Sequence, residues 1–140
     1  MSGLLVAAPA SGSGKTTVTL GLARAFADAG MRLVSGKAGP DYIDPAFHAA
    51  ASGKPCLNYD PWAMRPDLIR ANAAHQAGEG DFLLIEAMMG LFDGAADGTG
   101  APADLAATLG LPVVLVVDCS RMSQSVAALA KGYRDYRADV

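Results

Sequence analysis

The sequence has few cysteines and none at the spacing of a metal site. The chain of 140 residues contains two, Cys56 and Cys119, and it has no C-x-x-C pair. Cysteines and histidines at short spacing are the usual signature of a zinc site, which is therefore not expected. The two cysteines are expected to be free thiols, as in a protein of the reducing cytoplasm.

Clusters of basic residues and long apolar runs are also absent. The formal net charge is −3 and Lys and Arg form no cluster, so we expect no nucleic-acid surface. The longest apolar run, LGLPVVLVV, is too short to cross a bilayer, and the N-terminus does not have the pattern of a signal peptide. Apolar residues make up 51% of the chain, which predicts one globular domain with a sizeable core.

Short apolar runs alternate with segments of helical spacing. The alternation predicts an α/β fold of three layers, with a mostly parallel sheet between helices. Because no further element follows the last helical segment, the chain is interpreted as a fragment of a longer protein. Strands are expected at 3–8, 31–37, 81–86 and 111–118, and helices at 14–30, 45–52, 65–80, 102–110 and 123–136.

Four loops follow the expected strands, at 9–16, 37–45, 87–98 and 118–125. Ligands of parallel sheets bind beyond the carboxyl ends of the strands. We therefore expect these loops to meet at one edge of the sheet and to form the functional site there.

The first of these loops, PASGSGKTT, predicts a phosphate-binding turn. Backbone N–H groups between a strand and a helix can wrap a phosphate, Lys15 can reach the β- and γ-phosphates of ATP, and the Thr16 hydroxyl can bind Mg²⁺. Pro9 stands where the strict G-x-x-x-x-G-K-[ST] pattern has glycine, but the strand–loop–helix context favours this reading over an incidental lysine. The expected nucleotide-binding residues are Ser11, Gly12, Ser13, Gly14, Lys15, Thr16 and Thr17.

A lysine early in this loop is typical of the partition and arsenite-type ATPases. In this sequence that place is taken by Ala10. A dimer-forming nucleotide switch of that type is therefore disfavoured.

Several carboxylates are candidates for the acid opposite the phosphate loop. Glu86 and Asp118 each end an apolar run, and either can face a bound Mg²⁺, although both can also serve as a helix cap or turn residue. Asp93 lies in an Asp-Gly pair, which is common in turns. Asp41 and Asp44 have a stronger case, because the loop around them is stiffened by two prolines and follows a strand.

Other conspicuous residues of the chain receive no chemical role from the sequence. His48 and His75 lie on expected helices without a partner at ligand spacing. Tyr59 and Trp62 are interpreted as local packing residues, and Asp44 as the N-cap of a short helix that begins at Pro45.

Five stretches together resemble the cobyrinic or hydrogenobyrinic acid a,c-diamide synthases. The stretch KAGPDYIDPAFHAAASGKP is specific through GPDYIDP, and EAMMGLFDG is specific through MGLFDG, whereas the phosphate-loop stretch APASGSGKTTVTLGLARA alone is not. The other two are NYDPWAM and the run from ADLAATLG to ALAKGY, so the likeness spans nearly the whole chain. The family loop usually reads E-G-V-M-G, whereas Ala87 and Met88 follow Glu86 here.

The resemblance implies an ATP-dependent synthetase domain, similar in fold to dethiobiotin synthetase, that occupies residues 1–140 and is truncated. It implies amidation of the a and c acetate groups of the corrin ring through an acyl phosphate, in cobalamin biosynthesis. ATP and Mg²⁺ would be the cofactors and a corrinoid the substrate. Ammonia would come from glutamine in a class I amidotransferase domain that this chain lacks, and a homodimer is compatible with these features.

Roles for individual residues also follow from the resemblance. Thr16, Asp44 and Glu86 would bind the metal, as in dethiobiotin synthetase. Asp41 and Asp93 would orient the corrin carboxylate or the intermediate, and the catalytic set is Lys15, Lys37, Asp41 and Asp93.

Three alternatives stay open at this point. One is a sister enzyme, either cobyric acid synthase or another tetrapyrrole amidase. Another is dethiobiotin synthetase itself, against which the GPDYIDP loop argues. The third is a non-catalytic P-loop nucleotide switch.

Overall fold

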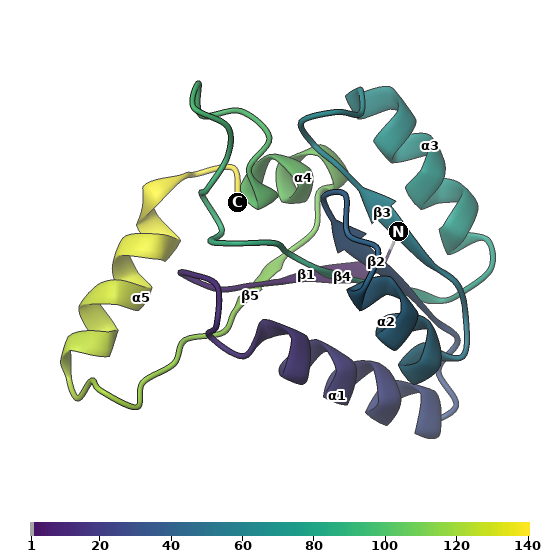
Figure 1. Ribbon diagram of the computed structural model, residues 1–140, viewed down its shortest axis with the longest axis horizontal. Helices are drawn as coiled ribbons and strands as arrows, with labels where there is room; N and C mark the ends of the chain where they lie inside the picture. The colour runs from purple at the N-terminus through teal and green to yellow at the C-terminus, as the bar shows by residue number, and fades with distance from the viewer. Residues whose placement is uncertain (1) are drawn as a thin grey trace.

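The structure is a computed structural model, and it describes residues 2–140. One parallel sheet lies between two layers of helices (Figure 1), as the sequence predicts. The strand order is β3-β2-β4-β1-β5. The strands are β1 (Gly3–Ala7), β2 (Leu33–Ala38), β3 (Cys56–Tyr59), β4 (Phe82–Glu86) and β5 (Val113–Leu115), and the helices are α1 (Lys15–Asp28), α2 (Asp44–Ser52), α3 (Pro66–Ala77), α4 (Pro102–Leu109) and α5 (Ser125–Tyr136).

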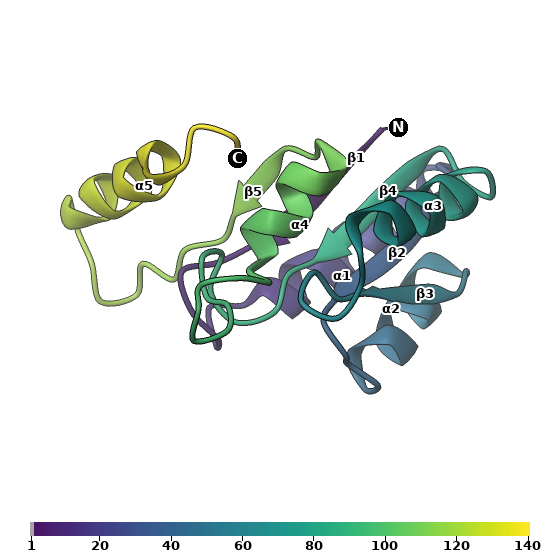
Figure 2. The ribbon, with the colours of Figure 1, turned by 90° about the horizontal axis from the view of Figure 1, so that it is seen from above.

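The helices are divided between the two faces of the sheet. Figure 1 shows α1 and α2 together on one side and α3 and α4 on the other, while α5 lies beyond the edge formed by β5. Figure 2, the view from above, shows α5 standing apart from the other helices at the end of a long connection. No helix among residues 2–140 is both long enough and apolar enough to span a membrane.

Alternation along the strands decides which side chains face which layer. In β4, Leu83 and Ile85 join the buried cluster beneath α3 and α4, whereas Leu84 joins the cluster beneath α1. Successive side chains of a strand point to opposite faces. Glu86, two residues after Leu84, therefore faces α1 and α2, and Lys37 does so by the same argument from Leu33 in β2.

Two expectations about the strands need correction. Strand β3 was not expected from the sequence, since it has only four residues and includes the polar Asn58. The strand expected at 111–118 is much shorter, because β5 covers only Val113–Leu115. Asp118 consequently lies beyond the strand, where its carboxylate accepts a hydrogen bond from the Ser120 N–H at 2.9 Å, as in a local turn.

The start of α2 also differs from expectation. Asp44 is the first residue of the helix, and its side chain does not cap it. Asp41 takes over this role, because its Oδ1 accepts hydrogen bonds from the backbone N–H groups of Ile43 at 2.8 Å and Asp44 at 3.0 Å. The Asp44 carboxylate is thereby left to face the site.

Candidate functional site

The phosphate loop joins β1 to α1 and has the backbone of an anion-binding turn. Gly12 and Gly14 adopt φ angles of 80° and 91°, which favour glycine, and Gly14 directly precedes the first residue of α1. The N-terminus of a helix presents unpaired N–H groups and a positive potential to an anion. The sequence prediction of this loop as a strand–turn–helix unit is confirmed.

The loop lines a cleft of about 390 Å³ at the carboxyl edge of the sheet. Ser13 does not line it, and its hydroxyl instead donates to the Ala10 carbonyl at 2.9 Å. The six other predicted nucleotide-binding residues do line it. The lining residues are Ser11, Gly12, Gly14, Lys15, Thr16, Thr17, Lys37, Asp44 and Glu86.

Lys15 connects the phosphate loop to the loop that follows β4 by a hydrogen bond. Its Nζ donates to the Met89 carbonyl at 2.8 Å and to the Ala10 carbonyl at 3.3 Å. Met89 has a φ of 47°, which is uncommon for a residue with a side chain. Burial lowers the pKa of Lys15, and the positive charge of Lys37 lowers it further, while Glu86 acts in the opposite direction.

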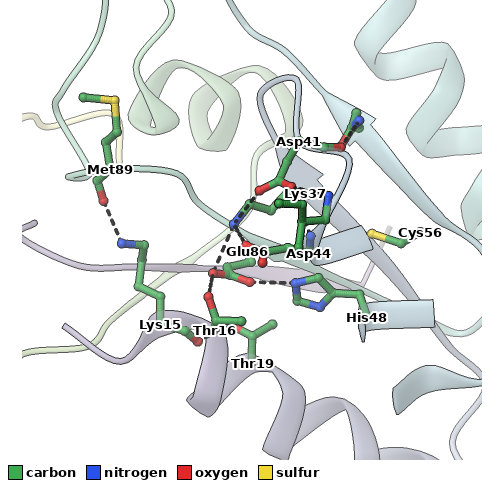
Figure 3. A network of polar contacts seen from close by, with 12 residues as sticks. Lys15, Thr16, Thr19, Lys37, Asp41, Asp44, His48, Cys56, Glu86 and Met89 are labelled. Atoms are coloured by element: carbon green, nitrogen blue, oxygen red, sulfur yellow. Dashed lines mark hydrogen bonds and ion pairs between the residues drawn. The ribbon is translucent and has the colours of Figure 1, made fainter. Parts of the chain in front are cut away.

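Lys37 and Glu86 form the centre of the site as neighbours in the sheet. They are register partners on the adjacent strands β2 and β4, and both face α1 and α2. The Lys37 Nζ lies 3.1 Å from Glu86 Oε1, and both side chains are buried. The Thr16 hydroxyl donates to the same Oε1 at 2.5 Å, so Glu86 connects the phosphate loop to β2 (Figure 3).

Two aspartates from the loop after β2 complete the surroundings of Lys37. The Nζ of Lys37 donates to Asp44 Oδ2 at 2.7 Å and lies 3.7 Å from Asp41 Oδ2. Burial alone would lower the pKa of Lys37, but the hydrogen bond to Asp44 and the charge of Glu86 raise it above its ordinary value. Lys37 is therefore a charged ammonium held among three carboxylates.

His48, which received no role from the sequence, belongs to the site. It is fully buried on α2, and its Nε2 lies 2.6 Å from Glu86 Oε2 (Figure 3). Burial would raise the pKa of Glu86, but the contacts with His48, Thr16 and Lys37 hold it below its ordinary value. The spacing in the sequence could have indicated His48. Residues four apart share a helix face, and His48 follows the candidate ligand Asp44 by four residues.

Asp93, Tyr59 and Trp62 lie outside the cleft that contains Lys37 and Glu86. Asp93 accepts a hydrogen bond from the Gly90 N–H at 2.8 Å and does not line the cleft of the phosphate loop. It lines a neighbouring cavity of about 260 Å³, together with Trp62, which is exposed there. Tyr59 is fully buried and donates to Gln76 at 2.6 Å, in agreement with a packing role, whereas Trp62 is not a core residue.

A comparison with known protein families also indicates a nucleotide-binding domain. A family model described as the CobQ/CobB/MinD/ParA nucleotide binding domain matches residues 4–139. The chain belongs to this family. The phosphate loop and the carboxyl edge of the sheet are therefore parts of a nucleotide-binding domain, within which the cleft at Lys15 lies.

Curated relatives match the whole of this CobQ/CobB/MinD/ParA domain. The chain is 73% identical over 140 residues to the hydrogenobyrinate a,c-diamide synthase of Sinorhizobium sp and 72% identical to that of Rhizobium meliloti (strain 1021), with 100% of the chain covered in both. The protein of the same name from Mesorhizobium japonicum is 53% identical over 98% of the chain. The chain spans about a third of the length of these relatives.

The donor atoms of this domain suit a hard cation such as Mg²⁺. Thr16, Asp44 and Glu86 offer oxygen ligands, and the carboxylates around Lys37 outnumber its single positive charge. Residues 2–140 contain no group of three or more His, Cys, Asp or Glu side chains placed to hold a metal by themselves. Mg²⁺ commonly takes only one or two carboxylates and completes its shell with phosphates and water, so the residues present fit it.

Proposed function

We propose that the chain is the ATP-using part of a hydrogenobyrinate a,c-diamide synthase in cobalamin biosynthesis. The observation that supports this most directly is the joint placement of Lys15, Lys37, Thr16 and Glu86 on one cleft beyond the phosphate loop. The relatives that match the whole chain carry this name, and the metal-free ring in the name favours hydrogenobyrinic over cobyrinic acid as substrate.

The reaction begins with a carboxylate that is too poor an acyl donor to react with ammonia. One of its oxygens forms a bond to the γ-phosphorus of ATP while the bond to the β,γ-bridging oxygen breaks, which gives an acyl phosphate and ADP. Ammonia released from glutamine then bonds to the acyl carbon while the bond from that carbon to the phosphate oxygen breaks, and inorganic phosphate leaves with the bonding electrons and takes up the proton that the nitrogen loses. Repetition at the second acetate gives the a,c-diamide. The glutaminase belongs to a part of the protein outside this chain.

The protein contributes mainly positioning and charge to the phosphoryl transfer. The ammonium of Lys15 can leave the Met89 and Ala10 carbonyls for the phosphates, which are stronger acceptors. Lys37 lies at the meeting point of the phosphate loop and α2, where a second cation lowers the repulsion between substrate carboxylate and nucleotide. A bound Mg²⁺ would neutralise part of the phosphate charge.

The carboxylates divide into two groups by their surroundings. Asp44 and Glu86 line the cleft and are proposed, with Thr16, to hold the cation. Asp41 accepts backbone hydrogen bonds at the start of α2, and Asp93 lies along the next loop. We assign Asp41 and Asp93 to the orientation of the corrin carboxylate, because they lie beside the cleft and do not line it.

The test is a product assay on the full-length protein that contains this chain. It is supplied with ATP, Mg²⁺, glutamine and either hydrogenobyrinic acid, cobyrinic acid or a biotin precursor, and products are weighed by mass spectrometry. We expect two successive amidations of hydrogenobyrinic acid and none with the Lys15→Ala variant. ATP hydrolysis without amide product would contradict the proposal and favour a nucleotide switch, and amidation of another ring at other positions would favour a sister amidase.

A further inference from the structure

His48 makes a contact that core packing alone does not explain. Its side chain is fully buried, and Nε2 lies 2.6 Å from Glu86 Oε2. Its other ring nitrogen, Nδ1, has no hydrogen-bond partner among residues 2–140. A buried polar atom without a partner destabilises a protein, whereas an apolar side chain of similar volume would avoid that cost.

The two oxygens of Glu86 have different partners. Oε1 receives the Thr16 hydroxyl at 2.5 Å and lies 3.1 Å from the Lys37 ammonium, while Oε2 meets only His48 among these residues. Figure 3 shows His48 approaching Glu86 from the side opposite Lys15. A carboxylate held at one oxygen cannot rotate freely, so the contact with His48 fixes the direction of the other oxygen.

Helix α2 supports both members of the central ion pair. Asp44 and His48 lie four residues apart on the same face of this helix, and they contact Lys37 and Glu86 respectively. The pair itself is fixed by strand register between β2 and β4. One rigid helix therefore sets the orientation of two side chains that come from two different strands.

We propose that His48 is a positioning residue for Glu86. Its Nε2–H donates to Oε2 and keeps Oε1 directed towards Thr16, at the place where the proposed function locates the cation of the bound nucleotide. This inference rests on that proposed cation and nucleotide site. Outer partners that orient a metal-binding carboxylate or histidine typically change metal affinity by about 10- to 100-fold when they are removed.

The test uses two amide substitutions that differ in reach. In the full-length protein, His48→Gln places a donor near the position of Nε2, whereas His48→Asn places one near Nδ1, too far from Glu86. Affinity for a non-hydrolysable ATP analogue is measured by calorimetry over a range of Mg²⁺ concentrations. We expect Asn to weaken the Mg²⁺-dependent part of binding by about 10- to 100-fold and Gln to retain most of it.

Controls separate positioning from stability. Ile69→Val alters the buried core on the opposite face of the sheet and destabilises the protein without touching the site. The free energy of unfolding is measured for all three variants. If the loss of affinity merely follows the loss of stability, or if Gln and Asn bind alike, His48 is a core residue only and the proposal is wrong.

A double substitution gives a second readout on the same contact. In the Glu86→Gln background, His48→Asn should add little further loss, because the carboxylate that it positions has been removed. Independent, additive losses would contradict the proposal. Since the readouts are nucleotide binding and stability rather than amidation, failure of the amidation assay would overturn the proposed function and would leave this test intact.

Discussion

The ammonium of Lys37 has its shortest contact with Asp44, at 2.7 Å. Asp44→Asn removes the charge of that acceptor and one oxygen that the proposed cation would use. A hydrogen bond to a charged group is worth about 1.5–3 kcal/mol, so kcat/KM for Mg²⁺-ATP should fall by roughly 10- to 100-fold. The measurement is steady-state kinetics of the full-length protein at several Mg²⁺ concentrations.

Asp67→Asn is the matched control for this substitution. Asp67 also lies in the first turn of a helix, but it is exposed, and its one ion pair among residues 2–140 is with the exposed Arg65. Exposed ion pairs contribute little to stability. The kcat/KM for Mg²⁺-ATP and its dependence on Mg²⁺ concentration should therefore be the same in Asp67→Asn as in the unsubstituted protein. An Asp44→Asn enzyme with unchanged Mg²⁺ dependence would remove Asp44 from the cation site.

Glu86 makes the stability of the protein depend on pH in a defined direction. Its pKa in the folded protein is lowered, so its contribution is present above the unfolded value of about 4.3 and is lost as pH falls through the folded pKa. Lys37 has a raised pKa, so its contribution is present below about 10.4 and is lost as pH rises through the folded value.

Urea unfolding between pH 7 and pH 3 tests the acid side of this argument. Glu86→Gln should lower the free energy of unfolding at pH 7 and flatten its decline towards pH 3, because the titrating group has gone. Glu79→Gln, at an exposed position, should leave the curve unchanged. A Glu86→Gln protein with the same acid limb as the parent would refute the assignment.

Sequence reasoning located most residues of the cleft but not the bonds between them. The glycine-rich loop between a strand and a helix indicated Lys15 and Thr16, and positions after or at the ends of strands indicated Asp44 and Glu86. His48 received no role from the sequence because its partner, Glu86, is 38 residues away and lies on strand β4. Pairings of that kind depend on strand order, which local patterns do not contain.

At the scale of elements, glycines of similar appearance have different roles. A Cβ on Gly36 in β2 would lie 2.7 Å from Tyr59 Cε2 and 3.2 Å from Ile85 Cγ1, whereas a Cβ on Gly21 in α1 would meet nothing within 4 Å. Gly36→Ala should therefore displace the buried Tyr59 and destabilise the protein by about 1–3 kcal/mol. Gly21→Ala should stabilise it by about 0.5–1 kcal/mol, because alanine favours the helix.

Denaturant midpoints of the two variants provide the measurement. Both substitutions add a methyl group, but only the one on Gly36 meets neighbouring side chains, so a lower midpoint for Gly36→Ala would report the crowding around β2. The Tyr59–Gln76 hydrogen bond should also weaken in Gly36→Ala, which would raise the hydrogen exchange of neighbouring amides. Equal midpoints would show that the sheet can shift to accept the methyl group.

The elements were predictable where periodicity was strong. Helices α1, α3 and α4 begin and end close to the expected residues, and β4 ends at Glu86 as expected. Strand β3 has only four residues and pairs with β2 alone, at the edge of the sheet. A strand this short contains no long apolar run by which the sequence could predict it. The position of β3 depends on its pairing with β2, so no local sequence pattern predicts it.

For the molecule as a whole, parallel strands bring residues that are distant in sequence to one edge. The loops after β1, β2 and β4 meet there through Lys15, Lys37 and Glu86, as the alternation of strands and helices predicts. The loop after β5 does not line the cleft. Loops 9–16 and 37–45 line the cleft, loop 87–98 reaches it through the hydrogen bond from Lys15 to Met89, and loop 118–125 contributes no lining residue.

Ligand binding at that edge should stabilise the entire protein. A ligand that binds only the folded state at 100 times its Kd adds about 2.7 kcal/mol to the free energy of unfolding. A non-hydrolysable ATP analogue with Mg²⁺ should accordingly raise the Tm of the full-length protein, and Lys15→Ala should abolish most of that rise. Scanning calorimetry with and without ligand measures the shift within each variant, so any change in baseline stability cancels. Lys131→Ala, at an exposed site on α5 that pairs with Asp135, should keep the full shift. An equal ligand-induced shift in Lys15→Ala would place the nucleotide elsewhere on the molecule.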